Sequence, residues 1–238
     1  MAKYKKEDLT MAAKATQEVI TIKPIKTQVF RIRLIGDTPL IMHAWSEKAK
    51  REMLEAQQGK KKVKAEKPRK NPVHDFVQSM YWLTDKPYIE PSMTDEESEQ
   101  AFIEAIEKGA RFGFPITAFK QAGNSAAYRM GWVKNQAALR GSYFLRSDTS
   151  SGLVEIHSDT PTMREDMVRI MTTTDIRYRG QFDNWYADID VEFNENGQFT
   201  KEDIVNVINA GGYICGAGEW RPEKDGDYGR YHVEIVSD

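Results

Sequence analysis

Alternating apolar and polar residues mark the strands that this chain is expected to form. The pattern is clear over 27–43, where near-alternation predicts a core strand that Gly36 and Pro39 end. Arg31 and Arg33 fall on one face of that strand, because successive side chains of a strand point to opposite sides. Further strands are expected over 143–146 and 153–157, around a turn, and over 185–193 and 230–236.

Apolar residues at helical spacing predict helices between these strands. Thr200 is expected to cap a helix that Gly211 ends, and Thr117 is expected to cap another that follows a proline. An acidic helix is expected to end at Gly109. Two more helices are expected, one capped by Ser46 and one amphipathic over 73–85.

The order of these elements predicts an α+β fold. Strand, helix, strand pair, strand, helix, strand is the ferredoxin-like or RNA-recognition-motif type, βαββαβ, whose helices cover one sheet face and leave the other for a ligand. Residues 1–26 precede this core as a polar N-terminal arm that becomes β-branched and is expected to order by pairing with a neighbour. The domain over 27–238 is expected to carry a basic insertion at 46–110 and a hairpin insertion at 160–182.

Composition narrows the function classes. The 238 residues carry a formal net charge of −2, so any nucleic-acid surface has to be a local patch. The single cysteine, Cys215, excludes a disulfide within the chain and a four-cysteine zinc site, and the scattered histidines predict no metal or cofactor. No apolar run reaches the roughly 20 residues of a membrane span, and MAKYKKEDLT has no apolar signal region. A cytoplasmic location without membrane contact is expected, in a bacterial host cell if a phage encodes the chain.

Two basic regions are candidate phosphate contacts. Segment 59–72 holds seven basic residues and one acidic residue, with Lys61 and Lys62 near its start. It predicts either a solvated flexible loop or a loop that orders on a phosphate backbone. Further candidates for nucleic-acid binding are Arg31 and Arg33 on one face of the first strand, and Arg177 and Arg179 in the predicted hairpin.

The stretch GAGEWRPEKDGDYGR, at 216–230, has the composition of a phosphate-binding loop. Its glycines are Gly216, Gly218, Gly226 and Gly229; its cations are Arg221, Lys224 and Arg230; its aromatic residues are Trp220 and Tyr228, with Tyr231 following. Glycines let backbone N–H groups face a phosphate, arginine grips phosphate bidentately, and aromatic rings stack on bases. The alternative is a glycine-rich turn with its aromatic rings packed inward. Lys120, in the first turn of its predicted helix, either joins the helix N-terminus in holding an anion or extends into solvent.

Three segments resemble the repeat-associated mysterious protein (RAMP) superfamily, which includes the backbone subunits of CRISPR effector complexes. FPITAFKQAGNSAAYR resembles the family's helix start P-x-S-x-L-K-G-A-L-R, and GDTPLIMH resembles E-T-P-L-x-I-G. The loop resembles G-x-G-x-x-R-S-x-G-x-G-R-x-x-V, in the family's position before the last strand. The resemblance covers about half of the chain. Gln121, Gly123, Asn124 and Ser125 depart from the helix pattern, and Pro222 and Glu223 interrupt the loop.

The resemblance implies a non-catalytic protein that binds single-stranded RNA or DNA and oligomerises along it as a ring or filament. Such a protein serves recombination, annealing or replication in a phage, or holds guide RNA in a CRISPR system. The alternative within the family is a metal-independent endoribonuclease, for which His43 is the one candidate residue, without an evident acid or base partner in the sequence. A further alternative is an interaction protein whose loop binds another protein. Asp188 and Asp190 share a strand face and are expected to be its polar side rather than a metal site.

Overall fold

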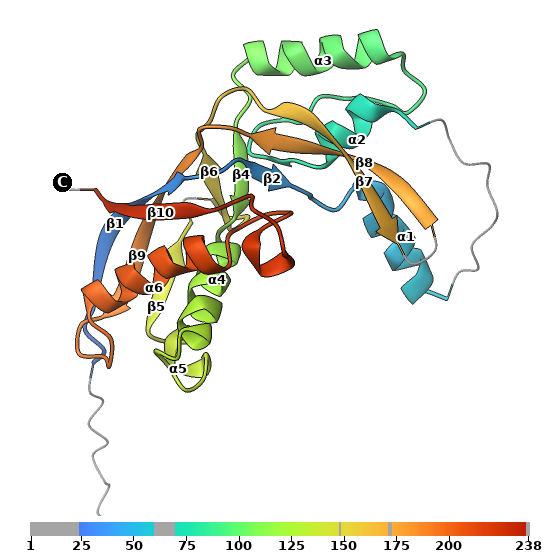
Figure 1. Ribbon diagram of the computed structural model, residues 1–238. Helices are drawn as coiled ribbons and strands as arrows, with labels where there is room; N and C mark the ends of the chain where they lie inside the picture. The colour runs from blue at the N-terminus through green and yellow to red at the C-terminus, as the bar shows by residue number, and fades with distance from the viewer. Residues whose placement is uncertain (1–23, 60–69, 148, 171–172, 237–238) are drawn as a thin grey trace, which may run out of the picture.

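The structure, a computed structural model, describes residues 24–59, 70–147, 149–170 and 173–236. It confirms a mixed α+β fold, with three antiparallel sheets in the described part of the chain (Figure 1). The four-stranded sheet has the order β10-β1-β9-β5. Its strands are β1 (Thr27–Gly36), β5 (Tyr143–Arg146), β9 (Tyr186–Asn194) and β10 (Tyr231–Ile235). Most of the predicted N-terminal arm lies outside the described residues.

Two three-stranded sheets extend the fold beyond the end of β1. One joins β2 (Leu40–Met42), β8 (Thr173–Phe182) and β7 (Thr162–Ile170), and the other joins β3 (Tyr81–Trp82), β4 (Phe112–Pro115) and β6 (Leu153–Ile156). β7 and β8 pair along their whole length, so the expected hairpin is confirmed.

The expected pairing around the turn between 143–146 and 153–157 is wrong. β5 pairs with β9, whereas β6 pairs with β4 in another sheet. The Thr149 hydroxyl accepts a hydrogen bond from the Leu153 N–H and donates one to the Leu153 carbonyl. These local bonds turn the chain from one sheet to the other instead of leaving Leu153 to pair with β5.

Helices α4 (Ile116–Arg129) and α6 (Lys201–Ile214) lie together on one face of the four-stranded sheet (Figure 1). They approach closely, because a Cβ on Gly211 would lie 2.6 Å from the Gly123 nitrogen. A Cβ on Gly212 would lie 1.9 Å from the Tyr231 carbonyl oxygen. The expected helix stop at Gly211 is therefore wrong: these glycines serve close packing inside the helix, which continues to Ile214.

The core lies between these two helices and the sheet. It is formed by buried side chains that include Ile32, Leu34, Phe119, Tyr143, Ile189, Val191 and Ile208. The remaining helices are α1 (Glu47–Gln57), α2 (Pro72–Gln78), α3 (Asp95–Glu107), α5 (Ala137–Arg140) and the 3₁₀ turn η1 (Pro222–Lys224). Within the described ranges, no helix is long and apolar enough to cross a membrane.

Two further helix boundaries hold, and two more besides Gly211 do not. Thr200 caps α6 with a reciprocal capping box, and α3 ends two residues before Gly109. Thr117 is not a cap, because α4 already begins at Ile116, whose N–H donates to the Gly152 carbonyl at 3.1 Å. The helix expected over 73–85 stops at Gln78, since β3 pairs with β4 directly afterwards.

Candidate nucleic-acid interface

The glycine-rich loop joins α6 to β10 and packs on β2 and on itself. Gly218 and Gly229 have positive φ angles of 76° and 65°. A Cβ on Gly218 would lie 2.4 Å from the Ile41 carbonyl oxygen, and one on Gly229 would lie 1.8 Å from the Ala217 carbonyl oxygen. The fold of the loop therefore requires glycine at these positions, whether or not a ligand approaches.

Most of the loop glycines also use their N–H groups inside the protein. Three donate to backbone carbonyls: Gly216 to Gly211, Gly226 to Arg221 and Gly229 to Pro39. Only Gly218, of the four glycines, lacks an N–H partner among the described residues. Of the glycine N–H groups predicted to contact a phosphate, only this one has no partner among the described residues.

Some of the basic side chains of the loop already form hydrogen bonds within the protein. The Arg221 guanidinium donates to the Glu223 carboxylate at 3.1 Å and to the Gly218 carbonyl at 2.9 Å. Glu223 also accepts a hydrogen bond from Arg129 of α4 at 2.9 Å, so the two arginines share one carboxylate. Lys224 is exposed at the end of η1. The Arg230 Nε is buried without a hydrogen-bond partner in the described part of the chain.

The loop aromatics face the β7–β8 hairpin. The Tyr228 hydroxyl accepts a hydrogen bond from Arg164 at 3.0 Å, and this guanidinium lies 4.6 Å from the centre of the Tyr228 ring. Asp166, with a 6% exposed side chain, accepts hydrogen bonds from Arg164 at 2.8 Å and Arg179 at 3.0 Å. Burial works to raise the pKa of Asp166, but hydrogen bonds from Arg164, Arg179 and Trp220 outweigh it and hold the pKa below its usual value. Trp220 and Tyr228 thus fasten the loop to the hairpin.

The two predicted hairpin arginines differ in accessibility. Arg179 has a 2% exposed side chain and lies 3.6 Å from Glu219 as well as beside Asp166. It holds the hairpin and loop together, and its burial withdraws it from direct contact with a ligand. Arg177 is half-buried, with Asp175 at 3.8 Å.

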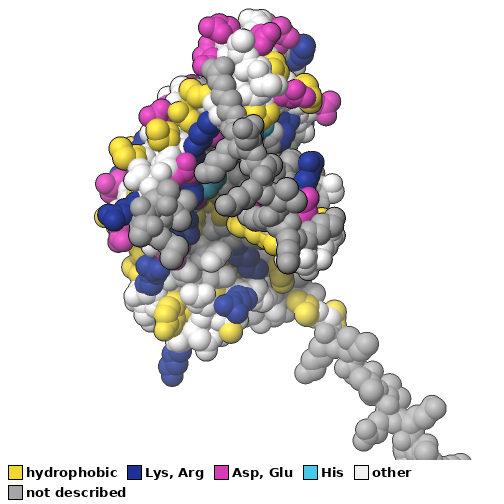
Figure 2. All heavy atoms as spheres, turned by 90° about the vertical axis from the view of Figure 1, so that its right-hand side faces the viewer, with side chains coloured by type: hydrophobic (Ala, Val, Ile, Leu, Met, Phe, Trp, Pro, Cys, Tyr) yellow, Lys and Arg dark blue, Asp and Glu magenta, His cyan; other side chains and the backbone are white. Residues whose placement is uncertain are grey.

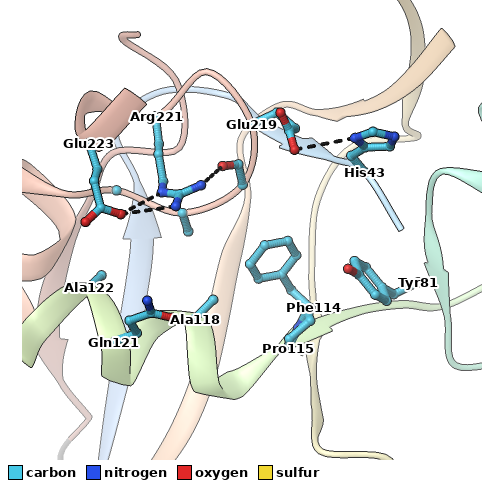
Figure 3. Close-up of a pocket in the computed structure, with 13 residues that line it drawn as sticks. His43, Tyr81, Phe114, Pro115, Ala118, Gln121, Ala122, Glu219, Arg221 and Glu223 are labelled. Atoms are coloured by element: carbon cyan, nitrogen blue, oxygen red, sulfur yellow. Dashed lines mark hydrogen bonds and ion pairs between the residues drawn. The ribbon is translucent and has the colours of Figure 1, made fainter. Parts of the chain in front are cut away.

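A cavity of about 200 Å³ lies between the loop and the start of α4 (Figure 3). His43 and Glu219 line one side of it, with the His43 Nδ1 3.5 Å from a Glu219 carboxylate oxygen. The hydrogen bond from His43 is the main reason why the pKa of Glu219 is lowered. Tyr81 also lines the cavity, and burial raises its pKa. No sequence pattern marks Glu219 as a partner for His43, because the two residues lie in segments far apart in the chain.

His43 also lines a second cavity of about 550 Å³ toward the hairpin. Trp45, Lys70 and Tyr178 contribute to it, and the Lys70 ammonium lies 5.7 Å from the Tyr178 ring centre. The same ammonium is 3.1 Å from Asp175, so the cation is neutralised locally. Lys61 and Lys62, which precede Lys70 in the basic insertion, lie outside the described residues.

Lys120 lies apart from the glycine-rich loop. Its ammonium donates to the Arg140 carbonyl at 2.9 Å and lies 4.4 Å from the centre of the Phe144 ring. Partial burial lowers the pKa of Lys120. Because α4 begins at Ile116 rather than after Thr117, Lys120 is in the second turn and does not join the helix N-terminus in an anion site.

Arg31 and Arg33 lie on the outer face of the four-stranded sheet, opposite aspartates of β9. Arg31 binds Asp190 at 2.7 and 3.0 Å, and Arg33 binds Asp188 at 2.7 and 2.8 Å. The hydrogen bond from each arginine is the main reason why the pKa of its aspartate is lowered. The aspartates therefore form ion pairs with the predicted phosphate contacts.

A segment of the chain that is rich in basic residues and contains no acidic residue is not among the predicted sites. Between Ile116 and Arg146 there is no aspartate or glutamate. The segment carries the basic residues Lys120, Arg129, Lys134, Arg140 and Arg146, and the exposed aromatic residues Tyr128, Trp132 and Phe144. Glutamates from other segments pair with two of these cations, Glu223 with Arg129 at 2.9 Å and Glu192 with Arg146 at 2.8 Å. Lys134 and Arg140 are exposed and have no acidic partner among the described residues.

Figure 2 shows the charge separation on one side of the molecule. Acidic side chains gather at the top, where α3 lies, and basic side chains occur in the lower part, toward α4 and α5. A count of Asp and Glu along the chain would have found the basic segment before its structure was known.

No metal centre is evident: the described residues include no group of three or more His, Cys, Asp or Glu able to hold an ion. Cys215 is buried, and this burial raises the pKa of its thiol. No protein-family model matches the chain, and no curated protein matches it either. Function therefore has to be inferred from the residues and their arrangement.

Proposed function

We propose that the protein is a non-catalytic, single-stranded nucleic-acid-binding protein that assembles along RNA or DNA. Its core is a ferredoxin-like βαββαβ unit related to that of the RAMP superfamily. The strand order β10-β1-β9-β5 supports this core, with α4 between β1 and β5 in the chain and α6 between β9 and β10. In a βαββαβ unit the first and third strands form the centre of the sheet, which here are β1 and β9.

The exposed side chains of segment 116–146, which we call the α4–β5 surface, are the observation that carries the proposal. The segment itself contains no Asp or Glu. Phosphates bind where cations are not cancelled by carboxylates, and Lys134 and Arg140 meet that condition. Exposed rings at Tyr128 and Trp132 give unpaired bases a place to stack. Stacking needs bases that are free of a duplex, so a single strand is the expected ligand.

Fluorescence anisotropy with the full chain tests this proposal. Labelled RNA and DNA single strands are compared with a duplex of the same sequence at several salt concentrations. We expect binding to the single strands, and Trp132→Ala should weaken it by about 5- to 150-fold, the loss for one stacked base. Trp45→Ala is the matched control, because Trp45 is 59% exposed against 49% for Trp132 but lies toward the hairpin.

Absence of binding to every probe would refute the proposed function. Equal losses for the two tryptophan variants would refute the α4–β5 surface as the binding site. Loss confined to Trp45→Ala would instead move the ligand to the cavity beside the hairpin.

The His43–Glu219 pair favours one second candidate, a metal-independent endoribonuclease. A carboxylate on Nδ1 orients the imidazole and leaves Nε2 to exchange a proton with a substrate. RNA cleavage in the presence of a chelator, lost in His43→Ala, would establish this activity. RNA that remains intact on the purified wild-type protein would leave binding as the function.

A further inference from the structure

The outer edge of β7 is the longest unpaired strand edge in the described part of the structure. β7 spans nine residues and pairs only with β8 among the described strands. The other edge strands of the sheets are two to five residues long. Long edges are usually blocked by charged side chains, above all lysine, or by proline or a bulge, because they recruit other strands. The charged residues of β7 include Arg164 and Asp166, which pair with each other on the face toward the glycine-rich loop. Thr162–Ile170 contains neither lysine nor proline.

This edge also presents apolar side chains to solvent. Met163 and Met167 point to the same side of β7, and Met167 is 75% exposed. Ile176, directly opposite Met167 on β8, is exposed as well. An added strand on β7 would cover the methionines and satisfy the open backbone groups together.

The N-terminal segment of the chain has the sequence of such a strand. Residues 19–22 read Val-Ile-Thr-Ile, three of them β-branched and apolar, and Pro24 follows to stop the pairing. We propose that residues 19–22 of one copy of the chain pair with the β7 edge of a second copy. This inference rests on the self-assembly in the proposed function and assigns the surfaces that carry it.

Chain length makes the partner a second copy. Residues 19–22 precede Thr27 by five to eight positions, which lets them reach roughly 29 Å from the start of β1. β1 has ten residues, so it is about 33 Å long. The hairpin lies beyond the far end of β1, where β2 pairs with the last residues of β8, and it runs away from β1 (Figure 1). The segment therefore falls short of Met167 in its own chain.

The positions of the two surfaces determine the type of assembly. The donor segment precedes β1 in the sequence, and the start of β1 lies at the opposite end of the described structure from the hairpin that carries the acceptor edge (Figure 1). Contacts between two different surfaces are heterologous, so they build open filaments or closed rings rather than two-fold dimers.

Cross-linking between two single-cysteine variants tests the contact. Ile20→Cys protein is mixed with Met167→Cys protein and treated with a short bismaleimide, whose span accommodates neighbouring strand registers. We expect a product of two chains that neither variant forms alone, because the native Cys215 is buried. Tyr213→Cys, at an exposed position of α6, replaces Met167→Cys in the matched control and should give no such product.

Removal of residues 1–23 provides the second measurement. The shortened chain should retain its circular dichroism spectrum and its affinity for a short oligonucleotide, but light scattering should give the mass of one chain. Three results would overturn the proposal. The first is an equally strong cross-linked product with Tyr213→Cys, the second is no product at all, and the third is a multimer that persists after the deletion. If the Ile20→Cys and Met167→Cys variants cross-link but the protein binds no nucleic acid, the proposed binding function is refuted and this contact is supported.

Discussion

Replacement of both Lys134 and Arg140 by alanine tests whether the α4–β5 surface binds phosphates through these two cations. Both side chains are exposed and lack an acidic partner among the described residues, so the change breaks no ion pair seen in the structure. The Arg140 carbonyl that Lys120 uses is a backbone group and is retained. We therefore expect the folded structure to remain intact.

The size of the effect follows from counterion release. Each phosphate neutralised on a single strand contributes about 0.7 to the slope of log K against log salt, so two lost contacts lower the slope by about 1.4. If wild type and variant converge near 1 M salt, this slope predicts a roughly 14-fold weaker affinity at about 0.15 M. Anisotropy titrations at four or more salt concentrations measure the slope directly.

The control removes two lysines that line a pocket beside α3, Lys86 and Lys108, and its slope should stay at the wild-type value. An unchanged slope in the Lys134/Arg140 variant would refute the phosphate contacts at these positions. The same decrease in both variants would show that only net charge matters, and the local surface would lose its support.

Two further predictions concern stability. Gly229→Ala should destabilise the fold by about 1–3 kcal/mol from the positive φ alone, and the 1.8 Å approach to the Ala217 oxygen adds to this cost. The control, Gly141→Ala, lies in open space at negative φ and should leave the melting temperature unchanged or slightly raised. Equal effects of the two changes would contradict the packing argument. Asp166→Asn should lower the free energy of unfolding, measured in urea near neutral pH, by up to about 3–5 kcal/mol. The buried Arg179 then loses its hydrogen-bonded carboxylate and keeps only Glu219 at 3.6 Å. Since the pKa of Asp166 is lowered in the folded state, this difference should be full above about pH 4 and shrink as the pH falls further; a pH-independent difference would exclude the carboxylate charge as its cause.

The sequence was informative where local chemistry decides the structure. The capping box at Thr200 and the alternation along β1 and β9 depend on neighbouring residues, and both are present in the structure. The prediction at Gly211 is wrong because a helix-breaking glycine and a close-packing glycine look alike until the second helix is placed. The separation of β5 from β6 depends on a threonine side chain in the turn, which no periodicity reveals.

For the candidate site, the sequence indicates the right residue types but not their partners. Arg179 and Trp220 are residue types that often bind nucleic acids, but in the structure Asp166 accepts hydrogen bonds from both of them. Asp166 comes from the predicted hairpin, so its pairing with the loop depends on tertiary structure. His43 and Glu219 were missed as a pair for the same reason.

The paired charges on the outer sheet face favour the α4–β5 surface as the proposed ligand site. A ligand on the outer sheet face would have to displace two bidentate arginine–aspartate pairs or bring phosphates beside Asp188 and Asp190. Either course opposes binding, because the released carboxylates repel phosphate. On the α4–β5 surface, Lys134 and Arg140 require no such exchange, and the Trp132 ring is already exposed. The four-stranded sheet is thus the scaffold of the proposed site, and the proposed contacts at Trp132, Lys134 and Arg140 come from the chain that follows α4, including α5.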